Sequence, residues 1–457
     1  MILGLRIPAI IKKFLKKDKR ENKPAVQIIP RDKHPISRDD ISEHALKVLY
    51  RLHKSGYDAY LVGGCVRDLL LGVTPKDFDV VTNATPEQIK GLFRNCRLIG
   101  RRFRLAHIVF GRDIIEVATF RGHHSDEEQG SNKSKTSKTG LVLRDNVFGS
   151  IEEDAARRDF TVNALYYNIA DFSIYDFVGG MEDLEKGVLK LIGDPEQRYR
   201  EDPVRMLRAA RFATKLSLKI SDDCRQPIPQ LSYLLDDIPA ARLFEESLKL
   251  FLAQRAVANF EVLNELGLLS HLFPILKAPL KDSNSNEYRM MMQVMKDTDK
   301  RLSANKSVNP AYLFAAILWY PMVARAQEIV QEATLAEYDA FQIAAAEITS
   351  VQARSISLPK RFSLPMRDIW LLQIRLRQQN PVKAKRLLSH PKFRAGYDFL
   401  LLRGVVENDD ELAKLSVFWN SMQEQFSDEV HSGKPSKPQK RRGTRRRRKP
   451  KSKKPSA

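Results

Sequence analysis

Two aspartates separated by one residue stand in the segment KDFDVVTNATPEQ, residues 76–88. The alternation of polar and apolar residues from Asp77 to Val81, ending in β-branched valines, predicts a strand. Residues two apart on a strand face the same side, so both carboxylates project together with Cα atoms about 6.5 to 7 Å apart. Neighbouring like charges repel, so we expect a cationic group between Asp77 and Asp79. The alternative is an edge strand with a solvated acidic face.

Glu116, in the apolar segment IIEVAT, is the candidate for a third carboxylate. If its strand neighbours that of Asp77 and Asp79, the three side chains form one cluster. Such a cluster suits two divalent cations about 3.5 to 4 Å apart, as used for in-line phosphoryl or nucleotidyl transfer. One cation lowers the pKa of an attacking hydroxyl, and the other neutralises a triphosphate and the leaving pyrophosphate. The alternative for Glu116 is an exposed strand position.

A glycine pair, Gly63 and Gly64, lies in LVGGCVRDLLLG between a predicted strand and a predicted helix. The free N–H groups of a helix start, with no side chains in front of them, allow a phosphate to approach the backbone. Arg67 stands about one turn into this helix, where its guanidinium is expected to reach a triphosphate. Most glycine pairs are simply turns, so this interpretation depends on the two aspartates that follow in the chain.

Two arginine-rich segments come later. The first, RRDFTVNAL, contains Arg158 and Asp159. The second, EDPVRMLRAARF, has four charged residues at steps of three: Asp202, Arg205, Arg208 and Arg211. On a helix this spacing keeps neighbours on adjoining surface, so Asp202 is expected to orient Arg205 while the outer arginines face a polyanion. A solvated charged face is the alternative.

The elements that must position these residues follow from the hydrophobic periodicity. A helix is predicted over residues 37–56, and a second begins at Pro86 with Thr85 as its N-cap and Gln88 completing a capping box. Residues 104–122 predict a hairpin that turns near Gly111. Residues 21–36 read as a linker, and the polar Gly/Ser/Lys-rich residues 122–146 as a mobile loop. From about residue 195 helical periodicity dominates.

The charge is concentrated at the two ends of the chain. The 457 residues carry a net charge of +21, of which 13 Lys or Arg stand in residues 433–457 and +6 in the first twenty residues. The body between them is close to neutral, so the ends predict a polyanionic partner, with nucleic acid first and acidic lipid second. Three dispersed cysteines without C-x-x-C spacing favour a reducing, cytoplasmic compartment.

Together these motifs resemble the class II nucleotidyltransferases of the DNA polymerase β superfamily, which include bacterial poly(A) polymerases and CCA-adding enzymes. The resemblance covers roughly residues 59 to 250, and its four motifs occur in the order of the family: LVGGCVRDLLLG, DFDVVTNATPE, RRDFTVNAL and EDPVRMLRAARF. It implies an α+β fold, in which a DNA polymerase β-like head with a mixed sheet precedes a helical neck and body and a disordered basic tail.

The resemblance also assigns roles to residues. It implies that Asp77, Asp79 and Glu116 bind two Mg²⁺ ions, with Mn²⁺ as an alternative, and that Asp159 belongs to the catalytic set. The residues expected to hold the nucleotide are Gly63, Gly64, Arg67, Arg158, Asp202, Arg205, Arg208 and Arg211. The expected parts are an N-terminal extension and linker (1–38), the head (39–190), the neck (191–255), an RNA-binding body (256–427) and the tail (428–457).

Within the family we expect template-independent addition of AMP from ATP to RNA 3′ ends, which by resemblance promotes mRNA decay. The segment LIGRRFRLAHIVFG and the basic tail favour this activity over its alternative, a CCA-adding tRNA nucleotidyltransferase. A non-catalytic RNA-binding protein is disfavoured, because binding alone has no need of three carboxylates facing a polyanion. We expect a cytoplasmic monomer, whose basic ends contact RNA, RNA-decay proteins or the acidic inner face of the membrane.

Overall fold

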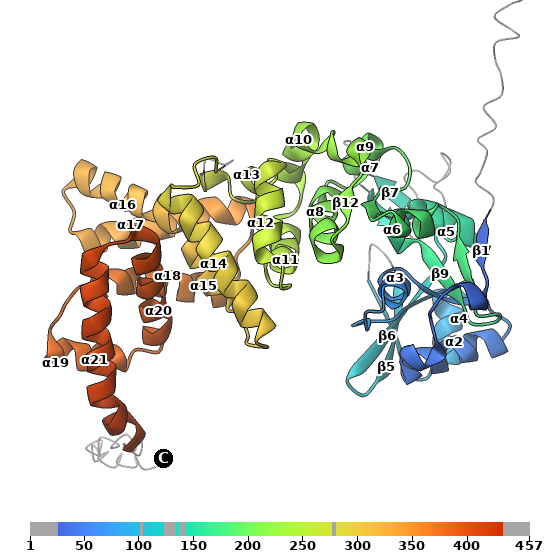
Figure 1. Ribbon diagram of the computed structural model, residues 1–457, viewed down its shortest axis with the longest axis horizontal. Coiled ribbons are helices and arrows are strands. Elements are labelled where there is room, and N and C mark those ends of the chain that lie inside the picture. The colour runs from blue at the N-terminus through green and yellow to red at the C-terminus, as the bar shows by residue number, and fades with distance from the viewer. Residues whose placement is uncertain are drawn as a thin grey trace, which may run out of the picture. The chain divides into compact units, whose positions relative to one another are not determined.

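The computed structural model describes residues 26–100, 104–122, 134–136, 142–145, 147–276 and 280–432. Its helices and strands are labelled in Figure 1, and the chain divides into two compact units. The first takes the described residues up to Ser283, with Met295–Val308 and Thr349–Leu358. The second takes Asn284–Val294, Asn309–Ile348 and the described residues from Pro359 onward. The predicted boundaries at residues 190 and 255 stay predictions.

One mixed sheet organises the first unit, with its strands in the order β1-β10-β9-β2-β3-β6-β5-β4. The strands are β1 Gln27–Ile29, β2 Ala59–Val62, β3 Asp79–Thr82, β4 Cys96–Ile99, β5 Leu105–Phe110, β6 Asp113–Thr119, β9 Leu165–Asn168 and β10 Ile174–Asp176. The β3–β6 pair is parallel, and the other neighbours are antiparallel. The predicted mixed sheet and the hairpin around Gly111 are therefore confirmed.

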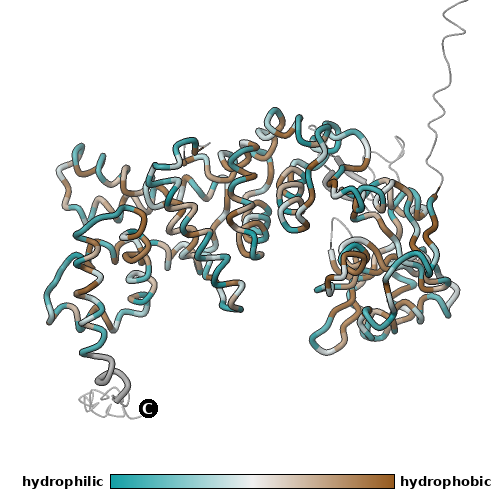
Figure 2. The backbone as a smooth tube through the Cα atoms, viewed as in Figure 1, coloured by the Kyte–Doolittle hydropathy of each residue, from teal (hydrophilic) through white to brown (hydrophobic). Residues whose placement is uncertain are grey.

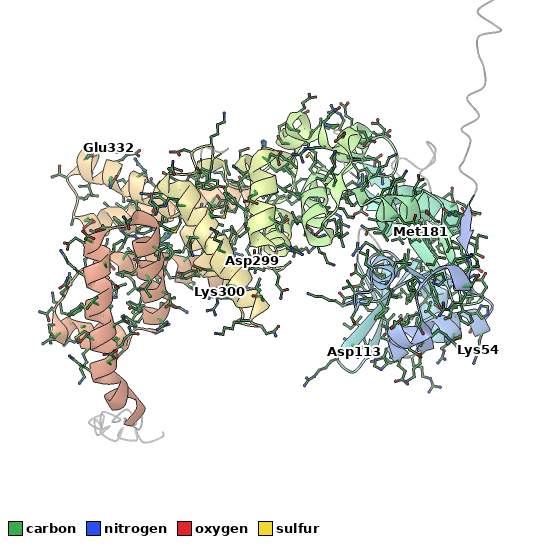
Figure 3. All side chains as sticks on the ribbon, viewed as in Figure 1. Lys54, Asp113, Met181, Asp299, Lys300 and Glu332 are labelled. Atoms are coloured by element: carbon green, nitrogen blue, oxygen red, sulfur yellow. The ribbon has the colours of Figure 1, made fainter. Side chains whose placement is uncertain are left out.

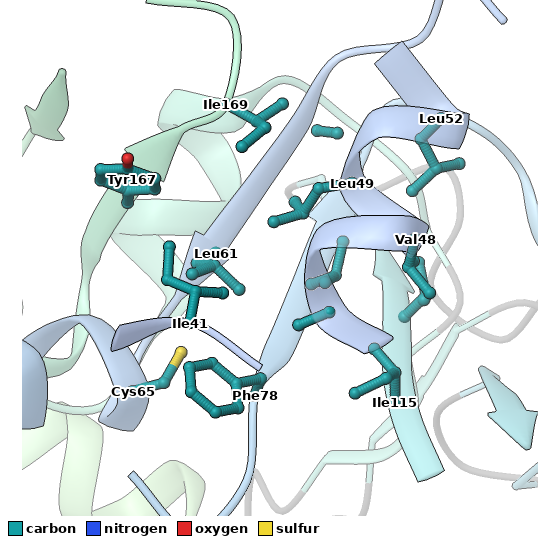
Figure 4. Packing of buried hydrophobic residues seen from close by; sticks show 14 of the residues in the cluster. Ile41, Val48, Leu49, Leu52, Leu61, Cys65, Phe78, Ile115, Tyr167 and Ile169 are labelled. Carbon is teal, nitrogen blue, oxygen red and sulfur yellow. The ribbon is translucent and has the colours of Figure 1, made fainter. Parts of the chain in front are cut away.

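Helices of the head cover this sheet: α2 Glu43–Lys54, α3 Gly64–Leu70, α4 Pro86–Leu92, α5 Ile151–Arg157 and α6 Gly180–Glu185. The predicted capping box of α4 is present, since Thr85 and Gln88 exchange hydrogen bonds. The hydroxyl of Ser42 caps α2. In the core, Val48 of α2 lies close to Ile115 of β6 (Figure 4).

Helices dominate the rest of the chain. In the first unit these are α7 Pro195–Glu201, α8 Val204–Leu216, α9 Asp222–Arg225, α10 Ile228–Leu231, α11 Ala240–Phe251, α12 Ala256–Glu265 and α13 Leu269–Leu272. A short parallel pair, β11 Val188–Leu189 and β12 Lys219–Ile220, accompanies them. Hydrophobic and hydrophilic residues alternate along the helices (Figure 2), as expected where one face of a helix is buried.

The second unit is helical. Its helices are α15 Pro310–Ile317, α16 Trp319–Ala333, α18 Lys360–Leu376, α19 Pro381–Leu388, α20 Phe393–Glu407 and α21 Asp410–Ser432, while α14 Asn286–Ser303 and α17 Glu337–Ser355 contribute to both units. Among the described residues no single helix is long and apolar enough to cross a membrane. Only α15 and α16 taken together meet that criterion, and they are bent by 56° where they join.

Three predicted segments differ from the structure. Residues 27–29, predicted as linker, form edge strand β1, which pairs with β10. Within the predicted loop 122–146, β7 Ser134–Thr136 and β8 Val142–Asp145 form an antiparallel pair. The predicted tail begins at residue 428, whereas α21 continues to Ser432; residues 433–457 lie outside the described residues. β1, β7 and β8 are too short for apolar periodicity to mark them, and the sequence at the end of α21 is mostly polar.

Candidate active site

A pocket of about 1150 Å³ lies in the first unit, between the start of α3, the starts of β3 and β6, and α8. The predicted site residues that line it are Gly63, Gly64, Arg67, Asp77, Asp79, Glu116, Arg158, Asp159, Arg208 and Arg211. Asp202 and Arg205 do not line it. The structure therefore gathers four motifs that are far apart in the chain into one concave site of the size that small-molecule ligands occupy.

The acidic centre of the pocket is built by the β3–β6 pair. Asp79 opens β3 and stands opposite Glu116 in the parallel register. Asp77 lies just before the strand rather than within it, which corrects the predicted strand start. Between the two, the side chain of Phe78 is buried in the core. The chain thus anchors Phe78 on the core side and leaves both aspartates in the pocket.

The carboxylate of Asp79 is open to the pocket yet surrounded by protein atoms. Partial removal from bulk water and the negative charges of Glu116 and Asp77 raise the pKa of Asp79 to about 6, although the charge of Arg158 opposes this. The repulsion that the sequence predicts is therefore present in the protein alone.

These carboxylates suit hard divalent cations in the chemistry of their oxygens. Within the described part of the chain, no group of three or more His, Cys, Asp or Glu side chains is already spaced to hold a metal ion. Mg²⁺ commonly binds one or two carboxylates together with substrate phosphates rather than a complete protein cage. The donor set of Asp77, Asp79 and Glu116 fits that mode of binding.

Gly63 occupies the turn between β2 and α3 with φ +78°, a backbone conformation that side-chain-bearing residues rarely adopt. A Cβ atom added to it would lie 3.5 Å from Nη1 of Arg158. The glycine therefore permits the turn and leaves room for an arginine across the pocket.

Arg67 was predicted to reach a triphosphate, but its side chain is only 2% exposed. Its guanidinium donates hydrogen bonds to Asp68 (2.9 Å from Nε) and to the side chain of Asn163. Arg67 thus lines the wall of the pocket while it joins α3 to the segment that precedes β9. Its direct contact with a nucleotide stays a prediction.

Arg158 is fixed from behind by Asp154, a carboxylate that is 1% exposed, at 3.0 Å. The hydroxyl of Tyr166 donates to the same Asp154 oxygen at 2.8 Å and accepts from Nε of Arg158 at 2.9 Å. Burial by itself lowers the pKa of Arg158, but the interactions with Tyr166 and Asp154 raise it well above its ordinary value. Arg158 therefore presents a permanent positive charge to the pocket.

Asp159 accepts hydrogen bonds from Nε of Arg208 at 2.8 Å and from the side chain of Asn163 at 3.2 Å. Burial alone raises the pKa of Asp159, but the charge and hydrogen bonds of Arg208 lower it far below its ordinary value. An aspartate engaged in this way is a poor metal ligand. The geometry favours Glu116 as the third carboxylate and gives Asp159 the task of orienting Arg208.

Three arginines surround the ring of Phe212 on α8. The guanidinium carbons of Arg67, Arg208 and Arg211 lie 5.4, 5.2 and 4.4 Å from its centroid. Nε of Arg211 is buried without a hydrogen-bond partner within the described residues. Burial and the charge of Arg208 lower the pKa of Arg211. Charges of one sign brought this close favour an anion, so this face of α8 is a cationic wall.

The predicted pairing of Asp202 with Arg205 is wrong in this structure. Asp202 binds Arg242 of α11 at 2.8 Å, and Arg205 binds Glu201 at 2.9 Å. Oδ1 of Asp202 is buried and has no hydrogen-bond partner among the described residues. This oxygen is therefore an acceptor without a donor in the described part of the chain.

Sequence reasoning missed several pocket residues, among them His107, whose Nε2 lies 3.2 Å from Oε1 of Glu116 but outside hydrogen-bond geometry. Asn163 stands within RRDFTVNAL, so its proximity to Asp159 was available from the motif. Lys76 and Arg112 also line the pocket. They are single charges in turns, and no spacing in the sequence singles them out.

Comparison with known families places three matches along the chain. Residues 59–190 match the family described as Poly A polymerase head domain. Residues 217–280 match Probable RNA and SrmB- binding site of polymerase A, and residues 333–453 match Polymerase A arginine-rich C-terminus.

Curated relatives agree with these matches. The chain is 55% identical over 424 residues to Poly(A) polymerase I of Salmonella typhimurium, covering 92% of this chain and 91% of that protein. It is 47% identical to Poly(A) polymerase I of Haemophilus influenzae, covering 89% and 90%. A CC-adding tRNA nucleotidyltransferase of Halalkalibacterium halodurans is 34% identical over 62% of this chain and 64% of its own.

Solved structures support the fold. The CCA-adding enzyme of Bacillus stearothermophilus in complex with CTP has a TM-score of 0.57 at 23% identity, covering 84% of this chain and 82% of that chain. The Thermotoga maritima CCA-adding enzyme complexed with tRNA has a TM-score of 0.51 at 19% identity, covering 90% and 88%. At such identities the likeness concerns the fold alone.

Proposed function

Because the chain belongs to the family of bacterial poly(A) polymerases, we propose that it adds AMP from ATP to RNA 3′ ends without a template. The activity is that of a polynucleotide adenylyltransferase. The observation that carries the proposal is the parallel pairing of Asp79 with Glu116, which sets carboxylates opposite the cationic wall of α8 in one pocket. The lower identity and coverage of the CC-adding relative disfavour the tRNA-specific alternative.

In the proposed reaction the 3′-hydroxyl of the RNA attacks the α-phosphate of ATP. The new bond joins the 3′ oxygen to that phosphorus, and the bond from that phosphorus to the oxygen bridging to the β-phosphate breaks. Pyrophosphate leaves with the electron pair of that bond, and the hydroxyl proton passes to water. Divalent cations held by Asp77, Asp79 and Glu116 would lower the pKa of the hydroxyl and offset the triphosphate charge. The family implies a divalent metal, and we propose Mg²⁺, with Mn²⁺ as a substitute.

The chain's own groups orient the nucleotide. Arg158, Arg208 and Arg211 line the pocket as cations and provide charge-assisted hydrogen bonds to phosphate oxygens. Asp154 and Asp159 hold two of these arginines in place, so little is lost in ordering them when the nucleotide binds.

We propose that Asp202 and Arg205, which lie outside the pocket, select the base of the nucleotide. Oδ1 of Asp202 is buried and lacks a donor among the described residues, and once exposed to the nucleotide it would accept from the exocyclic amino group of a base. Adenine and cytosine both carry such a group, so selection of ATP requires that Arg242 and Glu201 fix the pair in one geometry.

A direct test incubates the purified protein with RNAs of unrelated 3′ sequence and each nucleoside triphosphate separately. ATP is expected to support repeated addition to all of them, and CTP to be a poor substrate. The products are read on a denaturing gel with tRNA lacking its 3′ end as a second substrate. Addition of two C and one A to that tRNA, followed by arrest, would reject polyadenylation and leave the metal site intact.

We propose that the basic tail binds RNA. We also propose that the protein acts in the cytoplasm, where ATP and RNA are both present. Truncation after Ser432 removes 13 Lys or Arg. The slope of log K for RNA against log salt is expected to fall by about 0.7 for each phosphate that the tail neutralises, with the rate at saturating RNA unchanged. A Gly/Ser tail of equal length is the control. An unchanged slope would assign the tail to another partner, such as RNA-decay proteins or acidic lipid.

We propose that the protein acts as a monomer.

A further inference from the structure

The pocket extends past Glu116 to the tip of the β5–β6 hairpin, where Figure 3 labels Asp113. Lys76, Arg112 and Ile114 line this end of the pocket, and neither the reaction nor base choice uses them. Glu116 and Arg112 are four residues apart, so their Cα atoms are separated by at most about 13 Å. The tip of the hairpin, where Arg112 lies, is therefore close to the acidic centre.

Lys76 and Arg112 differ from Arg158 and Arg208 in having no carboxylate partner. Arg158 and Arg208 are each paired with a buried aspartate. Across the part of the chain that the structure describes, Lys76 and Arg112 make no ion pair or side-chain hydrogen bond. Two uncompensated cations in a concave site favour an anionic ligand.

Ile114 adds an apolar surface beside these charges. It is 47% exposed, although it stands on a strand whose next residue, Ile115, is buried in the core. Residues two apart on a strand share a face, so Ile114 lies on the same face as Glu116. An exposed isoleucine between a carboxylate and an arginine is suited to packing against a ribose or a base.

The turn that carries Arg112 is held in position by α2. The ring of His44 stacks on Phe110 with centroids 4.4 Å apart, and its Nδ1 lies 3.1 Å from Oδ2 of Asp113. Both sides of the turn are thus tied to one helix. Arg112 is presented from a fixed turn, so binding a ligand requires little ordering of the backbone.

The reaction needs two anionic substrates, and the cationic wall of α8 accounts for one of them, the triphosphate. We propose that Arg112, Lys76 and Ile114 bind the 3′-terminal nucleotide of the RNA. Arg112 and Lys76 contact the last backbone phosphate, while Ile114 packs against the terminal ribose or base. This subsite rests on the proposed function, and it gives a role to the cations that line the hairpin end of the pocket.

Arg112→Ala tests the subsite in steady-state extension of a short oligoadenylate. The KM for RNA is expected to rise about tenfold, the loss of one charge-assisted hydrogen bond, with the KM for ATP unchanged. Arg94→Ala is the matched control, because Arg94 is exposed in the head outside this pocket. A rise in the KM for ATP instead would move Arg112 to the nucleotide site and overturn the proposal.

A chemically altered RNA identifies the phosphate. An oligoadenylate with an uncharged methylphosphonate at its last linkage is expected to bind wild-type protein about tenfold more weakly than the normal oligoadenylate, whereas the double variant Lys76→Ala/Arg112→Ala should bind the two with little difference. Fluorescence anisotropy without ATP gives this comparison independently of catalysis. Equal sensitivity of both proteins to the neutral linkage would overturn the assignment.

Ile114→Thr tests the apolar contact, with Ile99→Thr as its control on exposed edge strand β4. Both changes keep β-branching, and only the first is expected to raise the KM for RNA. Normal extension by wild-type protein with no effect of Arg112→Ala or Ile114→Thr rejects the subsite alone. Failure of wild-type protein to extend any RNA rejects the proposed function and the subsite with it.

Discussion

Asp79→Asn is expected to lower the rate of RNA extension by at least about 10³-fold, equivalent to about 4 kcal/mol of transition-state stabilisation. Asp79 stands opposite Glu116 in the β3–β6 register, so its loss removes one of the three carboxylates that we propose to hold the cations. RNA affinity is expected to be retained or slightly higher, because a negative charge is removed. Single-turnover extension at saturating ATP and RNA measures the effect.

Asp58→Asn is the matched control. Asp58 is exposed and lies just before β2, at the end of the β2–β3 pair opposite to Asp79. The Asp58→Asn variant should extend RNA at the wild-type rate. Because the pKa of Asp79 is raised in the folded protein, ionised Asp79 opposes folding above about pH 6, and Asp79→Asn should raise the melting temperature at neutral pH. Parallel loss of folding and activity would point to a structural role.

Asp154→Ala is expected to lower the free energy of unfolding by about 3 to 5 kcal/mol, because it leaves Arg158 without its partner in a buried site. Tyr166 loses the acceptor for its hydroxyl in the same change. Urea unfolding at pH 7 measures the difference. Glu152→Ala, an exposed position on the same helix, should stay within about 0.5 kcal/mol of the wild type.

The same pair predicts a pH dependence. Burial raises the pKa of Asp154, but the charges of Arg158 and Arg121 and the hydrogen bond from Tyr166 bring it below its ordinary value. The stabilisation is therefore fully present above the unfolded pKa of about 3.9 and is lost as the pH falls through the lower, folded value. The difference in free energy of unfolding between the wild type and Asp154→Ala should become smaller below about pH 4. A difference that stays constant with pH would show that Asp154 stabilises the fold by packing rather than by its charge.

The acidic centre could be predicted from sequence because its residues occur in strongly patterned strands. Asp79 and Glu116 each lie among apolar β-branched residues, which fixes their strands but not the parallel register that sets one opposite the other. That register depends on the packing of α2 against Ile115 and on the hairpin that follows α4. Such long-range contacts leave no mark on a short stretch of sequence.

The arginine partners could not be predicted, because several choices satisfy the same local spacing. Arg205 stands three residues after Asp202 and four after Glu201, and either acid can pair with it on a helix. In the structure Arg242 of α11 forms an ion pair with Asp202, which leaves Glu201 as the partner of Arg205. Likewise the engagement of Asp159 with Arg208 joins residues 49 positions apart.

The short strand β1 has a consequence for anyone who shortens the chain at its beginning. Gln27–Ile29 pairs with β10 along its whole length, so β10 has a strand on both sides. A fragment that starts at residue 31 would lose the buried side chain of Ile29 and make β10 the new edge of the sheet. Its unpaired backbone N–H and C=O groups would then be open to pairing with strands of other molecules.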